Sequence, residues 1–275
     1  MQVERKKDLI SVKEIIFASV ICLGMAAMDI TAFPAALFIN ITISDITPQI
    51  FTVMINQWIV IAIGFIAIRF LCPQLFKQLG FTNLKSGFNS FGLPILVLII
   101  ASALACSLGQ IGSYNNTPSA EKIIVEGLVY YIGVGIIEEL YIRALLLNII
   151  ERLAYKTKHA TLLAIIVSSV MFGLGHIFGM IGQKALNIIC KVIFTIMLGI
   201  IFGIIYKKTN NLWLAVIAHI FVDFCGGVVF CFVSPVDYAI PTLIAIDVSY
   251  FAIALYLLWK YFFHKPKKEF SVVGQ

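Results

Sequence analysis

The chain is dominated by apolar segments that are each long enough to cross a lipid bilayer. A membrane-spanning helix needs roughly 20 mainly apolar residues. With 61% hydrophobic and 12% charged residues among 275, the chain lacks the polar side chains that a soluble globule needs for its surface. We therefore expect an all-α, polytopic membrane bundle of about eight transmembrane helices, near residues 15–39, 49–72, 91–111, 123–150, 160–180, 185–206, 211–233 and 239–262.

The connections between these segments are short, which leaves no room for a separate soluble domain. No internal repeat and no low-complexity tract interrupts them. We therefore treat residues 1–275 as a single integral-membrane domain. The first apolar run is too long for a signal peptide, contains Asp29 and Pro34, and is expected to be retained as the first span.

The basic residues predict how the chain is oriented. If the N-terminus is cytoplasmic, sixteen lysines and arginines fall on the cytoplasmic side, and only Lys122 and Lys184 fall on the other. This is a strong positive-inside bias, so we expect a multi-pass protein of the cell membrane with both termini in the cytoplasm. The net charge of +6 is then a topology signal with some attraction to anionic lipid, and we expect no nucleic-acid partner.

Three charged residues interrupt the fourth apolar segment. Glu138, Glu139 and Arg143 lie where hydrocarbon is expected, and ionisable residues in such places usually pair with one another and serve a function. On a helix, Glu139 and Arg143 are four residues apart and share a face, so Arg143 can neutralise Glu139. Glu138 is left as a buried carboxylate suited to act as a general base. A purely structural ion-pair cluster stays open as the alternative.

Two histidines also lie within apolar segments. His176 lies in the fifth segment, and His219 lies in the seventh with Asp223 four residues later, on the same helix face. Counted from the cytoplasmic ends of their segments at 1.5 Å per residue, these residues and Glu138 reach the middle band of the bilayer. The sequence therefore allows them to converge in space. The glycines around His176 permit close helix approach.

Three short motifs follow one another along successive segments. Residues 138–143 match EExxxR, residues 172–176 match FxxxH, and residues 219–223 match HxxxN or HxxxD. In this order they resemble the CAAX protease and bacteriocin-processing family (CPBP or Abi) of intramembrane endopeptidases, which is related to the CAAX prenyl endoproteases. The likeness covers a protease-like core of about residues 120–230.

The resemblance implies a peptidase in which a glutamate activates water. Glu138 is then the base, and His176 helps to hold or polarise the water. Arg143 is expected to pair with Glu139 and set the geometry of the helix. The reaction needs a water-filled polar cavity within the membrane, which we expect to open toward the cytoplasm.

The resemblance also implies that His219 and residue 223 stabilise the oxyanion or assist the leaving group. Many relatives carry asparagine where this chain has Asp223, and an ionised aspartate cannot donate a hydrogen bond. Asp223 could act when protonated, could orient His219, or could bind a metal. A zinc site, as in a metalloendopeptidase, would draw on Glu138, His176, His219 and Asp223. Because the chain lacks H-E-x-x-H spacing, we favour a mechanism without a required cofactor.

Two other classes of function stay open. A bacteriocin-immunity or regulatory membrane protein on the same scaffold would have the same motifs without needing proteolysis. A transporter could also use these charges, although no repeat or pair of broken helices indicates one. For the peptidase, the expected substrate is a peptide or a membrane-anchored protein.

Overall fold

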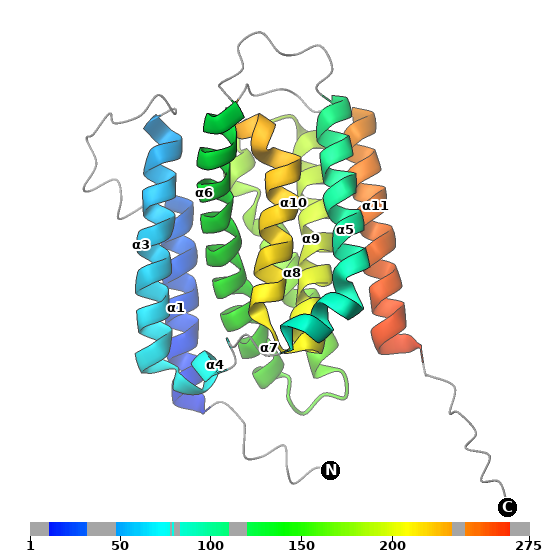
Figure 1. Cartoon of the computed structure of the whole chain (residues 1–275). Helices are drawn as coiled ribbons and strands as arrows, with labels where there is room; N and C mark the ends of the chain where they lie inside the picture. Colours follow the sequence, from blue (N-terminus) through cyan, green and yellow to red (C-terminus); the bar gives the residue numbers. More distant parts are fainter. Residues whose placement is uncertain are drawn as a thin grey trace, which may run out of the picture.

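Long helices run side by side along one common direction (Figure 1). The computed structural model describes residues 11–31, 48–77, 79, 83–109, 120–232 and 240–264, and this part contains no strand. The elements are α1 (Val12–Thr31), α3 (Pro48–Leu71), α4 (Pro73–Lys77), α5 (Leu84–Gly109), α6 (Ala120–Glu139), η2 (Leu140–Leu147), α7 (Asn148–Leu153), α8 (Ala160–Gly175), η3 (Phe178–Met180), α9 (Ala185–Thr209), α10 (Leu212–Phe232), α11 (Ile240–Leu258) and η4 (Trp259–Phe263).

The helices have the length and composition of membrane spans. Among the described residues, five stretches are long and apolar enough to cross a bilayer: Thr52–Leu71, Leu84–Leu104, Ala160–Met180, Ala185–Thr209 and Ile244–Phe263. The prediction of an all-α membrane bundle is confirmed, whereas the count of eight crossings stays a prediction. Residues 32–39 of the first predicted span, and both chain ends, lie outside the described residues.

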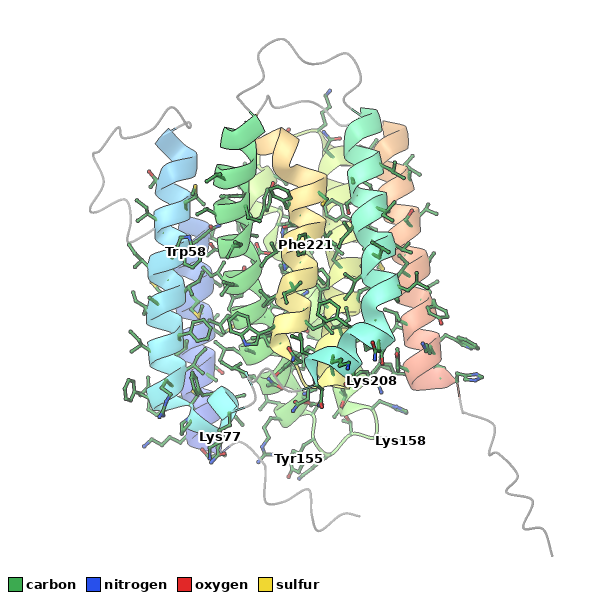
Figure 2. All side chains as sticks on the ribbon, in the orientation of Figure 1. Trp58, Lys77, Tyr155, Lys158, Lys208 and Phe221 are labelled. Carbon is green, nitrogen blue, oxygen red and sulfur yellow. The ribbon has the colours of Figure 1, made fainter. Side chains whose placement is uncertain are left out.

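Charged side chains gather at one end of the bundle. Figure 2 shows Lys77, Lys158 and Lys208 at that end, while Phe221 of α10 lies between the two ends. A cluster of lysines on one side is what the positive-inside rule predicts for a membrane protein. Placing that side in the cytoplasm stays a prediction.

The helix that carries the paired glutamates is not a regular α-helix throughout. α6 continues directly into η2, a π-helix of eight residues, and then into α7. The wider turn leaves backbone carbonyls that need other donors, and π-helical segments occur frequently at functional sites. The Cys22 thiol of α1 donates to the carbonyl of Tyr141 at 3.3 Å. The Asn148 amide donates to the carbonyls of Arg143 and Ala144, at 3.3 and 2.9 Å.

α1 is fixed at its beginning by a capping box. The backbone N–H of Glu14 donates to Oγ of Ser11 at 3.1 Å, and the carboxylate of Glu14 accepts from the N–H of Ser11 at 3.4 Å. The same carboxylate accepts the backbone N–H of Gln74 at 2.9 Å, which ties α1 to α4. These bonds hold α1 in place beside η2.

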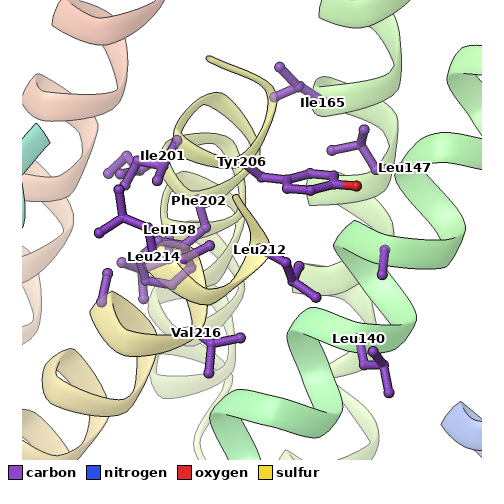
Figure 3. Packing of buried hydrophobic residues seen from close by; sticks show 14 of the residues in the cluster. Leu140, Leu147, Ile165, Leu198, Ile201, Phe202, Tyr206, Leu212, Leu214 and Val216 are labelled. Carbon is purple, nitrogen blue, oxygen red and sulfur yellow. The ribbon is translucent and has the colours of Figure 1, made fainter. Parts of the chain in front are cut away.

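A cluster of buried apolar side chains joins α8, α9 and α10 to η2. Figure 3 shows Phe202 and Tyr206 of α9 in this cluster, with Leu140 and Leu147 on η2 and Leu212 on α10. All five side chains are almost completely buried. This packing sets the distances between the helices that carry the three motifs.

α8 and α9 lie close together at two glycines. An added Cβ at Gly173 would lie 2.9 Å from the carbonyl oxygen of Val192, and one at Gly199 would lie 2.8 Å from Cβ of Ser169. Small residues allow such close contact between membrane helices. The contact holds the end of α8, and therefore His176, against α9.

We predict that Gly173→Ala destabilises the protein, because the added methyl group meets the backbone of α9. Overpacking of this kind costs about 1–3 kcal/mol. Gly175→Ala is the matched control on the same helix, since an added Cβ there meets nothing within 4 Å. Thermal unfolding of both purified variants in detergent checks this. Equal melting temperatures for the two variants would show that the close contact is absent.

Candidate active site

Glu139 lies at the centre of the polar cluster. Its Oε1 atom lies 3.0 Å from Nη1 of Arg143 and 2.8 Å from Nδ1 of His219. The Glu139 and Arg143 side chains are only 0% and 1% exposed. One carboxylate oxygen therefore joins two cationic or donor groups, one from its own helix and one from α10. The structure thus places the EExxxR and HxxxD motifs in direct contact.

The Arg143 guanidinium is enclosed by aromatic rings. Its Cζ atom lies 4.6 Å from the ring centroid of Phe172 on α8 and 5.6 Å from that of Phe202 on α9. Cation–π contacts of this kind stabilise a buried guanidinium relative to one that has no aromatic neighbours. Phe172 is the first residue of the FxxxH motif, so Arg143 connects the first motif to the second.

The imidazole of His219 lies among three carboxylates. Its Nδ1 atom faces Glu139, while its Nε2 atom lies 3.3 Å from Oδ2 of Asp223 and 3.5 Å from Oε2 of Glu138. The ring also packs against Phe202, with centroids 5.1 Å apart. Both ring nitrogens therefore face carboxylate oxygens, and the orientation of the ring is fixed on two sides.

His176 lies just beyond the last residue of α8. Its Nδ1 atom lies 2.9 Å from the carbonyl oxygen of Phe172, four residues earlier. Because a carbonyl can only accept, Nδ1 carries the proton in this contact, and Nε2 is the acceptor nitrogen when the ring is neutral. The edge of the ring also packs on Phe172, with centroids 4.8 Å apart. In its neutral form, an imidazole held in this orientation can accept a hydrogen bond from water.

A cavity of about 460 Å³ lies beside the cluster. Glu138 and His176 line it, together with side chains from α1, η2, η3 and α9. The Glu138 side chain is 15% exposed, in contrast to the fully buried Glu139. Of the six predicted site residues, Glu138 and His176 face this cavity. The other four do not line the cavity that the described residues form: Glu139, Arg143, His219 and Asp223.

Three polar residues of the cavity wall escaped the sequence analysis. Asp29 of α1, Tyr141 of η2 and Lys191 of α9 also line the cavity. The Tyr141 hydroxyl lies 3.5 Å from Oδ2 of Asp29, its hydrogen-bond acceptor. Lys191 had a detectable signal, because it is a charged residue within an apolar segment, as Arg143 is. Asp29 was noted in the sequence, but only as a reason to retain the first span.

The absence of a required zinc ion stays a prediction. Among the described residues, no group of three or more His, Cys, Asp or Glu side chains is placed to hold a metal ion. A metal-binding histidine needs one ring nitrogen directed at the metal. Both ring nitrogens of His219 are instead directed at carboxylates.

The comparisons with known proteins agree with the motifs. Residues 120–225 match the family model described as Type II CAAX prenyl endopeptidase Rce1-like. No curated protein matches the chain. The matched stretch runs from α6 into α10 and contains all six predicted site residues, while α1 with Asp29 lies outside it. The predicted resemblance to the CAAX protease family is therefore confirmed for residues 120–225.

Proposed function

We propose that this multi-pass membrane protein is an intramembrane endopeptidase in which Glu138 activates water. One observation carries the proposal: Glu138 and the fixed His176 face one cavity, while the neighbouring Glu139 is fully buried. Two adjacent carboxylates thus have different surroundings, one facing the cavity and one held by Arg143. The match to a CAAX endopeptidase family supports the same class of reaction.

In the proposed reaction, a water molecule lies between Glu138 and Nε2 of His176. Glu138 takes a proton from this water as its oxygen attacks the carbonyl carbon of the substrate. His176 accepts the second hydrogen as a hydrogen bond and fixes the direction of attack. The geometry that supports this step is the Nδ1 contact of His176 with the carbonyl of Phe172.

His219 and Asp223 support the reaction although neither is among the residues that line the cavity. Nε2 of His219 lies within 3.5 Å of both Glu138 and Asp223, so it can hold the Glu138 carboxylate and help to return its proton to the leaving amine. Asp223 then accepts from His219 and orients the ring. This assignment needs no metal, because both ring nitrogens already have protein partners.

The expected substrate is a peptide or a membrane-anchored protein. A cavity of about 460 Å³ lies in the range of about 300–1,000 Å³ that takes ligands of drug size, which suits a short peptide segment. Its walls are mainly apolar, as a substrate that arrives from lipid requires. We also propose that the lysine-rich end of the bundle faces the cytoplasm.

We predict that Glu138→Gln and His176→Ala each abolish hydrolysis while leaving the fold intact. Both residues face the cavity and contact the proposed water. The measurement uses purified protein in liposomes and a fluorogenic prenylated CAAX peptide, the substrate type that the matched family's name gives. Near-normal turnover by either variant would remove that residue from the mechanism. If the biological effect of the protein persists in Glu138→Gln, that result would favour an immunity or regulatory protein.

Arg143→Ala is the contrasting variant. It leaves the buried Glu139 without its cation, and breaking a buried ion pair costs about 3–5 kcal/mol. Its loss of activity should therefore accompany a clear loss of thermal stability, unlike that of Glu138→Gln. Unchanged melting of an inactive Arg143→Ala protein would show that Arg143 acts directly on the substrate.

We predict that Asp223→Asn keeps most of the activity and leaves the metal content unchanged. Asparagine retains a side-chain oxygen that can accept from Nε2 of His219, whereas Asp223→Leu does not and should lose orientation of the ring. Elemental analysis and turnover of the wild type and both variants check this. Stoichiometric zinc in the wild type that disappears in Asp223→Asn would overturn the metal-independent mechanism.

A further inference from the structure

Lys191 is a charged residue of the membrane bundle that the proposed mechanism does not yet use. It lies in α9, within one of the stretches apolar enough to cross a bilayer, and it lines the same cavity as Glu138 and His176. A cation therefore lies on the wall of the cavity that Glu138 and His176 also face.

A purely structural role does not account for Lys191. Its ammonium lies 4.6 Å from the ring centroid of Phe194, and it forms no salt bridge with a carboxylate among the described residues. Arg143, by contrast, has both an ion pair with Glu139 and two aromatic neighbours. An intramembrane cation that lacks an ion pair is costly, so its presence at a cavity indicates a function.

Peptide hydrolysis also needs a donor that the other site residues do not supply. The carbonyl oxygen becomes negatively charged during attack and requires preorganised donors or cations within hydrogen-bond distance. In the proposed arrangement Asp223 accepts from His219, and both ring nitrogens of His219 face carboxylates. The hydroxyl of Tyr141 lies beside Asp29. Lys191 is the strong donor on the cavity wall that these contacts leave available.

We infer that Lys191 is the electrophilic group of the site and stabilises the oxyanion of the substrate. The inference rests on the proposed function and deepens it. Glu138, near the end of α6, activates the water that attacks, and the cation on α9 stabilises the negative charge that the attack produces. The flexible four-carbon stem of lysine allows the ammonium to follow the carbonyl oxygen.

The complete step balances with water as the co-reactant. The water oxygen forms a bond to the carbonyl carbon, Glu138 takes one proton, and the carbonyl π electrons move to oxygen, opposite the Lys191 ammonium. When the tetrahedral intermediate collapses, the C–N bond breaks and the proton held by Glu138 passes to the leaving nitrogen. The products are a carboxylic acid and an amine, and both side chains return to their starting states.

The test is the turnover of Lys191→Met in liposomes. We use two fluorogenic prenylated CAAX peptides that differ only in a free or an amidated C-terminus. We expect kcat to fall by about 10²–10³, as for loss of one oxyanion donor, with little change in KM and equally for both peptides. Lys184→Met is the matched control, because Lys184 is an exposed residue just before the same helix and does not line the cavity. Its kcat should equal that of the wild type.

A second variant separates a chemical role from a structural one. Lys191→Ala should regain part of its kcat, in a saturable manner, when ethylammonium is added, while sodium has no effect. Wild-type kcat in Lys191→Met would overturn the inference and leave the proposed function intact. A rise in KM alone, or a loss of turnover confined to the free-acid peptide, would also overturn the inference. Either result would assign Lys191 to binding a substrate carboxylate. An inactive wild-type protein would contradict the proposed function itself, and the inference with it.

Discussion

The site depends on a single buried oxygen atom. Oε1 of Glu139 lies within 3.0 Å of both Arg143 and His219, and all three side chains are almost fully buried. In a low-dielectric interior such contacts are strong, and leaving one partner alone is costly. The contacts therefore fix η2 against α10, and the aromatic rings of Phe172 and Phe202 on Arg143 extend the same constraint to α8 and α9.

This constraint divides the polar residues into two layers. The inner layer consists of the buried residues Glu139, Arg143 and His219, whose contacts hold four helices together. The outer layer faces the cavity and contains Glu138, His176 and Lys191. Glu138 and Glu139 are adjacent in sequence, yet the helical turn sends one to each layer. In the neighbouring π-helix, the carbonyl of Tyr141 accepts a hydrogen bond from the thiol of Cys22 of α1, so a helix outside the matched region contributes to the cavity wall.

The sequence predicted what depends on local pattern. Apolar segments of sufficient length predicted the helices, and the spacing of Glu139 and Arg143 predicted that the two can meet. The contact between Glu139 and His219 was not predictable, because helical periodicity gives the face of a residue but not the neighbouring helix. The π-helix also depends on distant partners, such as Cys22. Lys191 was missed although the rule applied to Arg143 covers it too.

The central claim is that Glu138 activates water rather than attacking the substrate itself. A single turnover in water enriched in oxygen-18, with enzyme in excess over a prenylated peptide, tests it most directly by mass spectrometry of the new carboxyl group. General-base catalysis predicts one labelled oxygen in the product of that first turnover. A first-turnover product without the label, together with label in Glu138 after the reaction, would show that the carboxylate is a nucleophile and would contradict the account.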